Sequence, residues 1–203
     1  MYRKQVIYMG SFYNVFMYPL EKLGIRKARR ELVPRAKKKI LEIGSGTGAN
    51  LRYYRFSEIQ ELTLSDNTLS MPLINLHRRH SEKFDLVQLD VQELPFADNS
   101  FDFIIHTLVF CSVTDVDKGL KEIKRVLKCA GELLFIEHVL PSKKPLKSVF
   151  SFINPAWKKM ASGCNLNRDY LKSLKKNNFE ISYHKNFMNT AFVYGVATPK
   201  PHQ

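Results

Sequence analysis

The sequence predicts an α/β protein with a doubly wound, mostly parallel sheet. Two observations predict this fold. Short runs rich in β-branched and aromatic residues alternate with amphipathic helical stretches through the centre of the chain. A glycine-rich turn follows the first of these runs, at the place where doubly wound folds bind a ligand. With 203 residues, of which 44% are hydrophobic, the chain is long enough for one domain with a full core.

The hydrophobic pattern predicts each element in turn. Strands of a central sheet are expected at 38–44, 61–66, 84–90, 101–108 and 131–139. Two late strands, 179–187 and 190–198, are expected to form a closing hairpin, and helices are predicted at 50–56, 67–79 and 116–127. In the last helix Leu120, Ile123 and Leu127 share one face, and Gly131 gives a stop signal after it.

The formal net charge of +13 is unevenly distributed along the chain. Residues 1–39 hold eleven Lys and Arg against two Asp and Glu, a net charge of +9. Residues 141–176 hold nine against one, a net charge of +8, while residues 40–140 carry a net charge of −5. Two basic blocks therefore flank an acidic centre. Such blocks either bind an anionic partner or form a solvated surface without one.

The cysteines and the apolar content limit the classes of protein to consider. Cys111, Cys129 and Cys164 are an odd number without a C-x-x-C spacing, so we expect neither a disulfide scaffold nor a metal site. No window approaches about eighteen uninterrupted apolar residues, and the N-terminus lacks the pattern of a signal peptide. These features predict a protein of the reducing cytoplasm.

The most informative motif is ILEIGSGTGAN, residues 40–50. Its glycines, Gly44, Gly46 and Gly48, allow a tight turn and let a ligand lie against bare main chain. Alone, this spacing suits a dinucleotide or a simple turn. Glu42 changes the balance, because a carboxylate at the strand end orients the loop and attracts an ammonium group but repels a pyrophosphate. The motif has no Walker lysine, so a nucleoside triphosphate is not expected.

Two further acids end predicted strands. Asp66 ends the second strand, twenty-two residues after Gly44, where a carboxylate can accept hydrogen bonds from both hydroxyls of a ribose. Asp90 ends the third strand, where its carboxylate can accept from an adenine amino group while the Val91 amide donates to the ring. The apolar residues expected to wall this adenine are Leu94, Pro95 and Phe96.

Four stretches resemble, in order, the motifs of class I S-adenosylmethionine-dependent methyltransferases: ILEIGSGTGAN, LSDNTLSM, DVQELPFADNSFD and KEIKRVLKCAGELLFIEHV. The resemblance covers about residues 8–198 and is to the small-molecule, type 11 branch, which includes the ubiquinone/menaquinone C-methyltransferases. Residues 13–32, TLVFCSVTD and FIEHV are similar to bacterial phospholipid N-methyltransferases. Residues 153–174 resemble the mammalian methyltransferase-like thiol and lipid-droplet enzymes.

The resemblance implies a Rossmann-like, doubly wound sheet of seven strands, mostly parallel, with an antiparallel C-terminal hairpin. It also implies S-adenosylmethionine as the cofactor, S-adenosylhomocysteine as its product, and no metal. The cofactor-binding residues that it implies are Glu42, Gly44, Ser45, Gly46, Gly48, Asn50, Asp66, Asn67, Asp90, Val91, Gln92 and His106. We expect a single methyltransferase domain over residues 1–203, comprising a helical lid (1–36), a cofactor-binding core (37–140), a substrate-side insertion (141–176) and closing strands (177–203).

Two residues are candidates for catalysis. Methyl transfer from a sulfonium is an in-line displacement, so much of the catalysis comes from holding donor and acceptor in line. A base is needed only if the acceptor carries a proton, and the candidates are Tyr13 in the lid and His138 at the end of the fifth strand. Each has an alternative reading, Tyr13 as a packing aromatic and His138 as a packed histidine.

The acceptor is expected to be small and amphipathic or lipid-like, such as a phospholipid amine. C-methylation of a quinone, S-methylation of a small thiol and non-catalytic cofactor binding remain open as alternatives. Asn154-Pro155-Ala156-Trp157 is similar to a motif of base methyltransferases but lies far from its place after strand four, so nucleic acid is not favoured as a partner. The aromatic residues within the basic blocks predict peripheral contact with an anionic membrane at its inner face or, alternatively, a lid over a water-soluble acceptor. The oligomeric state is not indicated.

Overall fold

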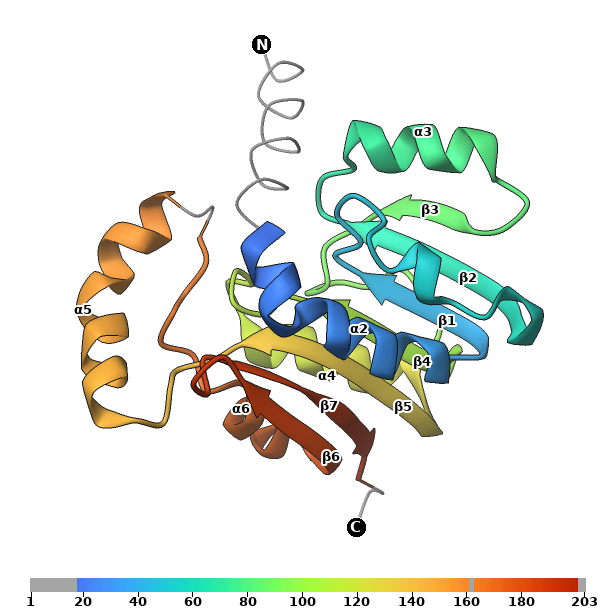
Figure 1. Cartoon of the computed structure of the whole chain (residues 1–203). Helices are drawn as coiled ribbons and strands as arrows, with labels where there is room; N and C mark the ends of the chain where they lie inside the picture. Colours follow the sequence, from blue (N-terminus) through green and yellow to red (C-terminus); the bar gives the residue numbers. More distant parts are fainter. Residues whose placement is uncertain (1–17, 161–162, 201–203) are drawn as a thin grey trace.

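The structure, a computed structural model, describes residues 18–160 and 163–200 (Figure 1). Within these residues one seven-stranded sheet has the order β3-β2-β1-β4-β5-β7-β6. Its strands are β1 Lys38–Ile43, β2 Ile59–Asp66, β3 Asp85–Gln88, β4 Phe101–Thr107, β5 Leu127–His138, β6 Phe179–Phe187 and β7 Phe192–Pro199. The first five strands pair in parallel, whereas β7 pairs antiparallel with both β5 and β6. The predicted mostly parallel sheet with an antiparallel C-terminal hairpin is therefore confirmed.

Helices cover both faces of this sheet (Figure 1). The helices and helical turns of the described residues are η1 Glu21–Ile25, α2 Arg26–Leu32, η2 Val33–Arg35, η3 Leu51–Tyr53, η4 Phe56–Glu58, α3 Met71–Arg79, α4 Val116–Val126, α5 Lys144–Met160 and α6 Tyr170–Lys176. Strand β1 is buried on both sides, since Ile40 packs into a core with α2 and α3 while Leu41 packs into a core with α4 and α6. This double burial explains the almost continuous apolar run in β1.

The strand order reverses beside β1. The chain extends from β1 through β2 to β3 on one side, then crosses to β4 on the other side of β1. In doubly wound sheets a ligand binds at such a switch point, outside the carboxyl ends of the strands. The fold therefore places the glycine-rich loop, which follows β1, at this position.

The strands agree with the predicted ranges to within a few residues, and β6 has the predicted bounds. Strand β5 begins at Leu127, four residues earlier than expected. Leu127 has an extended backbone (φ −79°, ψ 133°) and already pairs with Phe101, so the chain passes from α4 into the sheet without a loop. A shift in register between Phe101 and Phe103 accommodates the extra residues.

The helix predicted at 50–56 is wrong. Only the single turns η3 and η4 form there, because Tyr54 between them is extended (φ −68°, ψ 143°). Helix α3 also begins later than predicted, at Met71, since Ser70 caps it by accepting from the Leu73 amide and Pro72 occupies its first turn. Helices α5 and α6 were not predicted: α5 contains Pro155, a residue that normally interrupts a helix, and α6 has only seven residues.

None of the helices in the described ranges has the length and apolar content needed to cross a bilayer. Helix α5 stands at one edge of the molecule in Figure 1, beside the ends of β5 and β7 rather than over a sheet face.

Candidate active site

The glycine-rich loop follows β1 at the edge where the parallel strands end. Gly44, Gly46 and Gly48 have positive φ angles of 69°, 57° and 79°, a conformation that strains other residues. A Cβ on Gly44 would lie 2.2 Å from Val109 Cγ2, whereas no atom lies within 4 Å of a Cβ built on Gly46. Gly46 therefore presents bare main chain to open space, as a ligand lying against the loop requires.

The loop is held to β2 by its neighbours. Ser45 donates its amide to the Ser65 carbonyl at 2.9 Å, and Ser65 Oγ donates to the Glu42 carbonyl at 2.8 Å. Asp66 Oδ2 accepts from the Gly46 amide at 2.9 Å. Asn67 beside it is exposed. The Asp66 carboxylate, which is half-buried, thus orients the loop and keeps lone pairs for a ligand hydroxyl.

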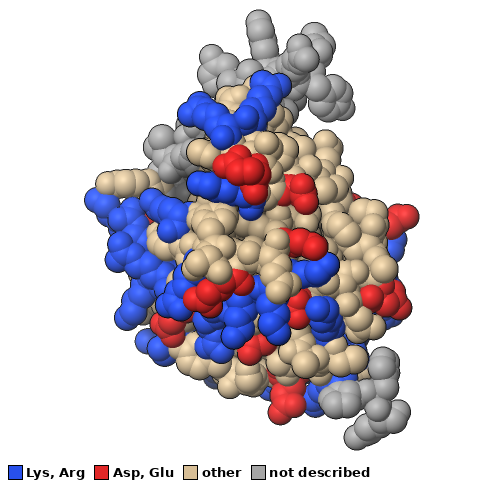
Figure 2. Space-filling view, turned by 90° about the vertical axis from the view of Figure 1, so that its right-hand side faces the viewer, with Lys and Arg blue, Asp and Glu red and all other residues tan. Residues whose placement is uncertain are grey.

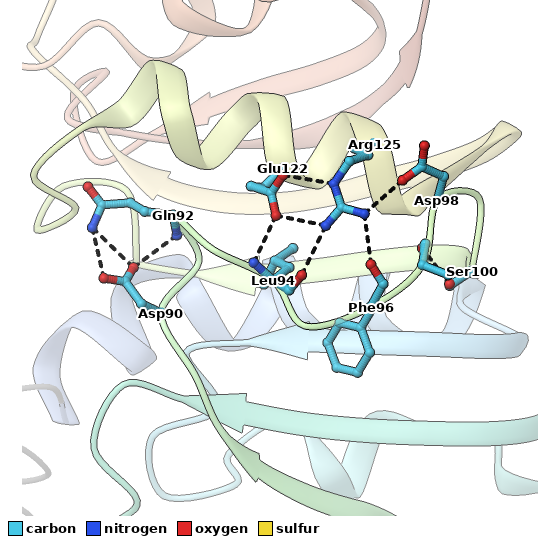
Figure 3. A network of polar contacts seen from close by, with 9 residues as sticks. Asp90, Gln92, Leu94, Phe96, Asp98, Ser100, Glu122 and Arg125 are labelled. Carbon is cyan, nitrogen blue, oxygen red and sulfur yellow. Dashed lines mark hydrogen bonds and ion pairs between the residues drawn. The ribbon is translucent and has the colours of Figure 1, made fainter.

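Asp90 lies beyond the end of the next strand, with its side chain exposed. Its Oδ1 accepts from the Gln92 amide at 2.9 Å, and Gln92 Oε1 accepts from the Asp115 amide at 2.8 Å. Val91 between them is buried. Asp90 and Gln92 bond each other (Figure 3), and Gln92 ties this pair to the start of α4.

Helix α4 fixes the segment that carries Asp90. Arg125 Nη1 donates to the Phe96 carbonyl at 2.7 Å and to Asp98 at 2.8 Å, and its Nη2 donates to the Leu94 carbonyl at 2.9 Å. Glu122 accepts from the Leu94 amide at 2.8 Å and pairs with Arg125 (Figure 3). The sequence does not indicate this role, because Glu122 and Arg125 at i, i+3 look like an ordinary ion pair on a helix surface.

The packing of this segment bears on the adenine wall that was expected from Leu94, Pro95 and Phe96. Leu94 is buried in the core with α4, and Phe96 packs edge-on against Phe101, with ring centroids 5.0 Å apart. The buried side chain of Leu94 is therefore not available to wall an adenine, whereas the role expected of the partly exposed Phe96 stays a prediction. Arg125 holds the carbonyls of both residues.

Glu42 lies under the glycine loop and is 2% exposed. It accepts a hydrogen bond from the Tyr54 hydroxyl. Burial raises the pKa of Glu42 from 4.5 to about 7, against the lowering effects of the Tyr54 hydrogen bond, the Arg29 charge and a hydrogen bond from Asn50. The free protein therefore holds this carboxyl partly protonated near neutral pH, and a cation placed beside it would favour the ionised form.

Arg29 of α2 joins the N-terminal helices to this end of the site. Its Nε and Nη2 donate to Glu21 Oε1 at 3.2 and 3.1 Å, and its Nη1 donates to Asn50 Oδ1. Asn50 in turn donates to Thr107 Oγ1 at 3.4 Å, at the end of β4. One buried guanidinium thus connects three segments that are far apart in the sequence.

His106 lies inside β4 and is fully buried. Its Nδ1 is 2.8 Å from Glu137 Oε1 and its Nε2 is 2.6 Å from the Tyr170 hydroxyl. Glu137 Oε1 also accepts from the amides of Val109 and Phe110, at 2.9 and 3.0 Å. Both ring nitrogens of His106 are occupied within the protein, so the imidazole shapes the loop after β4 and has no nitrogen left for a ligand.

His138 ends β5 and is 8% exposed. Its ring stacks on Phe150 of α5, with centroids 5.6 Å apart, and meets Phe192 of β7 edge-on at 5.1 Å. Nδ1 is buried, and no described residue bonds to it. Desolvation lowers the pKa of His138 from 6.5 to about 4, so the imidazole is neutral at physiological pH.

A cluster of apolar residues, here called the apolar wall, includes both rings that contact this imidazole. Its residues come from the N-terminal segment, the loop after β4, α5 and the β6–β7 turn: Leu20, Ile25, Leu108, Phe150, Phe187, Met188, Ala191 and Phe192. Here Gly24 permits a close approach, since a Cβ on it would lie 2.4 Å from the Phe187 ring. The result is an apolar region beside the end of β4, in which the buried Nδ1 of His138 has no partner among the described residues.

Two cysteines meet near this region. Asn165 donates its amide to the Cys111 carbonyl at 2.7 Å, which brings the loop after α5 against the loop after β4. The Cys111 thiol donates to Cys164, and this hydrogen bond, with one from Trp157, lowers the pKa of Cys164 to about 7. Burial and the same contact raise the pKa of Cys111. The spacing of the cysteines had not predicted that their thiols touch.

Comparisons with known proteins agree with this geometry. The family described as "Methyltransferase domain" matches residues 41–135, from β1 through β5. Human thiol S-methyltransferase TMT1A is 32% identical over 151 residues, which cover 72% of this chain and 62% of that protein. Demethylmenaquinone methyltransferase of Bacteroides fragilis is 32% identical over 156 residues, covering 72% and 63%. The chain belongs to the class I S-adenosylmethionine-dependent methyltransferases.

The fold has solved counterparts. A methyltransferase of Haloferax volcanii, solved with its activator Trm112, aligns with a TM-score of 0.73 over 97% of this chain and 98% of its own, at 14% sequence identity. At that identity the likeness concerns the fold alone. This methyltransferase chain spans only 62–63% of the length of the two relatives above.

The methyltransferase fold brings most of the predicted site residues to one edge. The glycine loop with Glu42 and Asn50 lies at its centre, Asp66 and Asp90 lie toward β3, and His138 lies toward β5. Tyr13 falls outside the described residues. Residues that the sequence did not indicate are Arg29, Tyr54, Arg125, Glu137 and Tyr170, all of which hold site residues in place.

The residues present fit the donor that this family uses. The open main chain at Gly46 and the accessible carboxylates of Asp66 and Asp90 suit an adenosine. The buried carboxyl of Glu42 suits an ammonium group.

Proposed function

We propose that this chain transfers a methyl group from S-adenosylmethionine to a small, amphipathic acceptor that enters beside His138. The observation that carries the proposal is the buried Nδ1 of His138, to which none of the described residues bonds, beside the apolar wall. A buried polar atom without a partner costs free energy, about 1–3 kcal/mol. An acceptor with an apolar body and one polar hydrogen would remove that cost.

The part of the site that would bind the methyl donor lies at the ends of the strands. S-adenosylmethionine supplies the electrophilic methyl group when it is bound. Asp66 and Asp90 would hold its adenosine, and Glu42 would face its ammonium group. The glycine loop would lie along the part of the cofactor between its adenosine and its ammonium group.

His138 would position the acceptor rather than act as a strong base. Its imidazole is neutral, and with a pKa of about 4 it binds a proton weakly. A free thiol has a pKa of about 8.5, so full proton transfer from a thiol to His138 would be strongly uphill. A hydrogen bond from the acceptor to Nδ1 would instead orient the attacking atom, which is the larger contribution to an in-line displacement.

A small thiol is the first acceptor to test, because its S–H could donate to His138 Nδ1, to which no described residue bonds, and because the human relative is named as a thiol S-methyltransferase. A phospholipid amine and a quinone ring meet the same requirement for an apolar body. They form the other two arms of the assay. Non-catalytic cofactor binding is the alternative of another class.

The test is methyl transfer from labelled S-adenosylmethionine to small alkyl and aryl thiols, demethylmenaquinone and phosphatidylethanolamine. His138→Gln should lower kcat about tenfold with the accepted substrate and leave S-adenosylhomocysteine affinity unchanged. His184→Gln, which changes an exposed histidine on β6, is the matched control. Transfer to none of the three classes, with cofactor binding intact, would favour the non-catalytic alternative.

A further inference from the structure

Helix α5 has three distinct faces. The inner face packs on the protein through four residues that follow one another at helical spacing, Leu146, Phe150, Asn154 and Trp157. Phe150 stacks on His138, and Asn154 Oδ1 accepts from the Leu166 amide at 2.6 Å. These contacts fix the helix against the acceptor side of the site, so its other two faces have a defined orientation.

The second face is apolar and exposed. Val149, Phe152, Ile153 and Ala156 follow an i, i+3, i+4, i+7 spacing. Phe152 is 87% exposed and Val149 is 52% exposed. Scattered exposed apolar residues are common in soluble proteins, but a contiguous apolar stripe along one helix indicates a binding surface. Because Phe152 points away from the protein, it cannot serve as part of a lid over the acceptor.

The third face is basic. Lysines lie at both ends of the helix and just before it, at Lys143, Lys144, Lys147, Lys158 and Lys159. Residues 138–168 contain no Asp or Glu, and within the described part of the chain none of these five lysines has an ion-pair partner. On the opposite side of the molecule, Lys and Arg are interspersed with Asp and Glu (Figure 2). The charge along α5 is therefore unbalanced.

We propose that α5 is an interfacial helix by which the protein binds the surface of an anionic lipid bilayer. Phe152, Val149 and Ile153 would enter the acyl boundary, and the lysines would face the headgroups. Helices of this kind lie in the interface plane with their apolar face buried about 5–10 Å. Each lysine near an anionic surface contributes about 1 kcal/mol.

Charge favours lipid over a second copy of the chain as the occupant. Two copies of α5 packed through their apolar stripes would bring ten lysines together without an intervening acid from residues 138–168, and like charges at close range repel. An anionic bilayer supplies the opposite charge and the apolar medium together. Since the inner face of α5 contacts His138, docking in this way would set the acceptor side of the site against the membrane.

The chain carries its own reporter for the test. Its single tryptophan, Trp157, lies on α5. The full-length protein would be titrated with vesicles of phosphatidylserine and phosphatidylcholine, and with phosphatidylcholine alone, at low and moderate salt. We expect binding to the anionic vesicles only, weakened by salt because surface charges are screened. Quenching of Trp157 by brominated acyl chains should accompany it.

Substitutions on α5 test whether this helix is the part of the protein that binds the vesicles. Phe152→Ser, and separately Lys147→Glu with Lys158→Glu, should each weaken binding to anionic vesicles about tenfold or more. The matched controls are Met71→Ser, an exposed apolar residue on α3, and Lys118→Glu with Lys121→Glu on α4. Circular dichroism and S-adenosylhomocysteine binding would report whether each variant folds.

Three results would overturn the proposal. The first is no association of the folded protein with anionic vesicles at low salt. The second is equal loss of binding in the α4 control and the α5 variant. The third is a dimer in sedimentation that Phe152→Ser converts to a monomer without any vesicle binding, which would assign the apolar stripe to a second copy of the chain. Each readout is independent of methyl transfer, so failure here leaves the proposed reaction untouched.

Discussion

Arg29 holds Glu21 and the glycine-loop segment at the same time. Its guanidinium bonds Glu21 Oε1 at 3.1–3.2 Å and also donates to Asn50, and its side chain is only 9% exposed. The second oxygen of Glu21 is buried, and no described residue bonds to it. The N-terminal helices are therefore attached to the site through the Arg29–Glu21 ion pair. Breaking that pair would leave the Glu21 carboxylate largely buried without a counter-ion.

The first prediction follows from this pair. Arg29→Met should lower the free energy of unfolding by about 2–4 kcal/mol, because Glu21 loses its counter-ion in a largely buried position. Adding Glu21→Gln to that variant should restore part of the loss. Denaturant titration measures both. Arg30→Met, next to it on the exposed side of α2, is the control and should change the unfolding free energy little. Equal effects of the two substitutions would contradict a specific role for the pair.

Asp66 supports the second prediction. Its carboxylate orients the Gly46 amide and lies where it would accept hydrogen bonds from the two hydroxyls of a ribose. Asp66→Ala should weaken S-adenosylhomocysteine binding by about 1–3 kcal/mol, the usual cost of a lost charged hydrogen bond. Calorimetry gives the affinity. Asp85→Asn, an exposed acid at the start of β3, should bind like the unaltered protein, and an Asp66 variant with the same affinity would place the ribose elsewhere.

The parts of the site that sequence could predict are local. The glycine loop, Glu42, Asp66 and Asp90 are recognisable because each stands at a fixed distance from a strand end, and the strands themselves follow from short apolar runs. Arg29, Glu137 and Tyr170 could not be found in this way. His106 meets Tyr170 across 64 residues and Arg29 meets Asn50 across 21, so these contacts depend on the topology rather than on any pattern near either partner.

The incorrect prediction of a helix at 50–56 also has a tertiary contact as its cause. Leu51 to Phe56 has the composition of an amphipathic turn, but Tyr54 gains more from turning inward to bond the buried Glu42 than from continuing a helix. Tertiary hydrogen bonding overrides propensity there. The burial of Leu94 likewise depends on tertiary packing, since Leu94 lies in a core with α4 and its carbonyl accepts from Arg125, 31 residues away.

The cysteine pair gives the third prediction. Because Cys111 and Trp157 donate hydrogen bonds to Cys164, its pKa is lowered to about 7, and only the thiolate reacts with alkylating agents. Alkylation of Cys164 should therefore rise to half its maximum near pH 7. Cys111→Ala removes one donor and should shift that midpoint to higher pH. Peptide mass spectrometry follows each cysteine separately. Cys129→Ser should leave the Cys164 profile unchanged, and an identical profile in Cys111→Ala would show that the thiol contact has no effect.

The last prediction concerns the proton on Glu42. Burial raises the pKa of this carboxyl to about 7. For an acid, a folded pKa above the unfolded value means that ionisation opposes folding, so the contribution of Glu42 to stability is most favourable below pH 4.5 and declines as the pH rises to about 7. A bound ammonium group would lower the pKa again, so cofactor binding should release a proton in this window.

The affinity for S-adenosylhomocysteine, which carries that ammonium group, should therefore be nearly constant just above pH 7. It should fall as the pH is lowered from 7 toward 5, because an increasing fraction of Glu42 must give up its proton to bind. Calorimetry near pH 6 in two buffers of different ionisation enthalpy should report release of up to one proton. In Glu42→Gln, which can still accept from Tyr54, this proton release should disappear and the affinity should become independent of pH over the same range. Glu132→Gln, which changes a half-buried acid in the middle of β5, should behave like the unaltered protein. A wild-type affinity that stays constant from pH 5 to 7 would mean that Glu42 does not face the ammonium group, and would move that end of the cofactor away from the buried carboxyl.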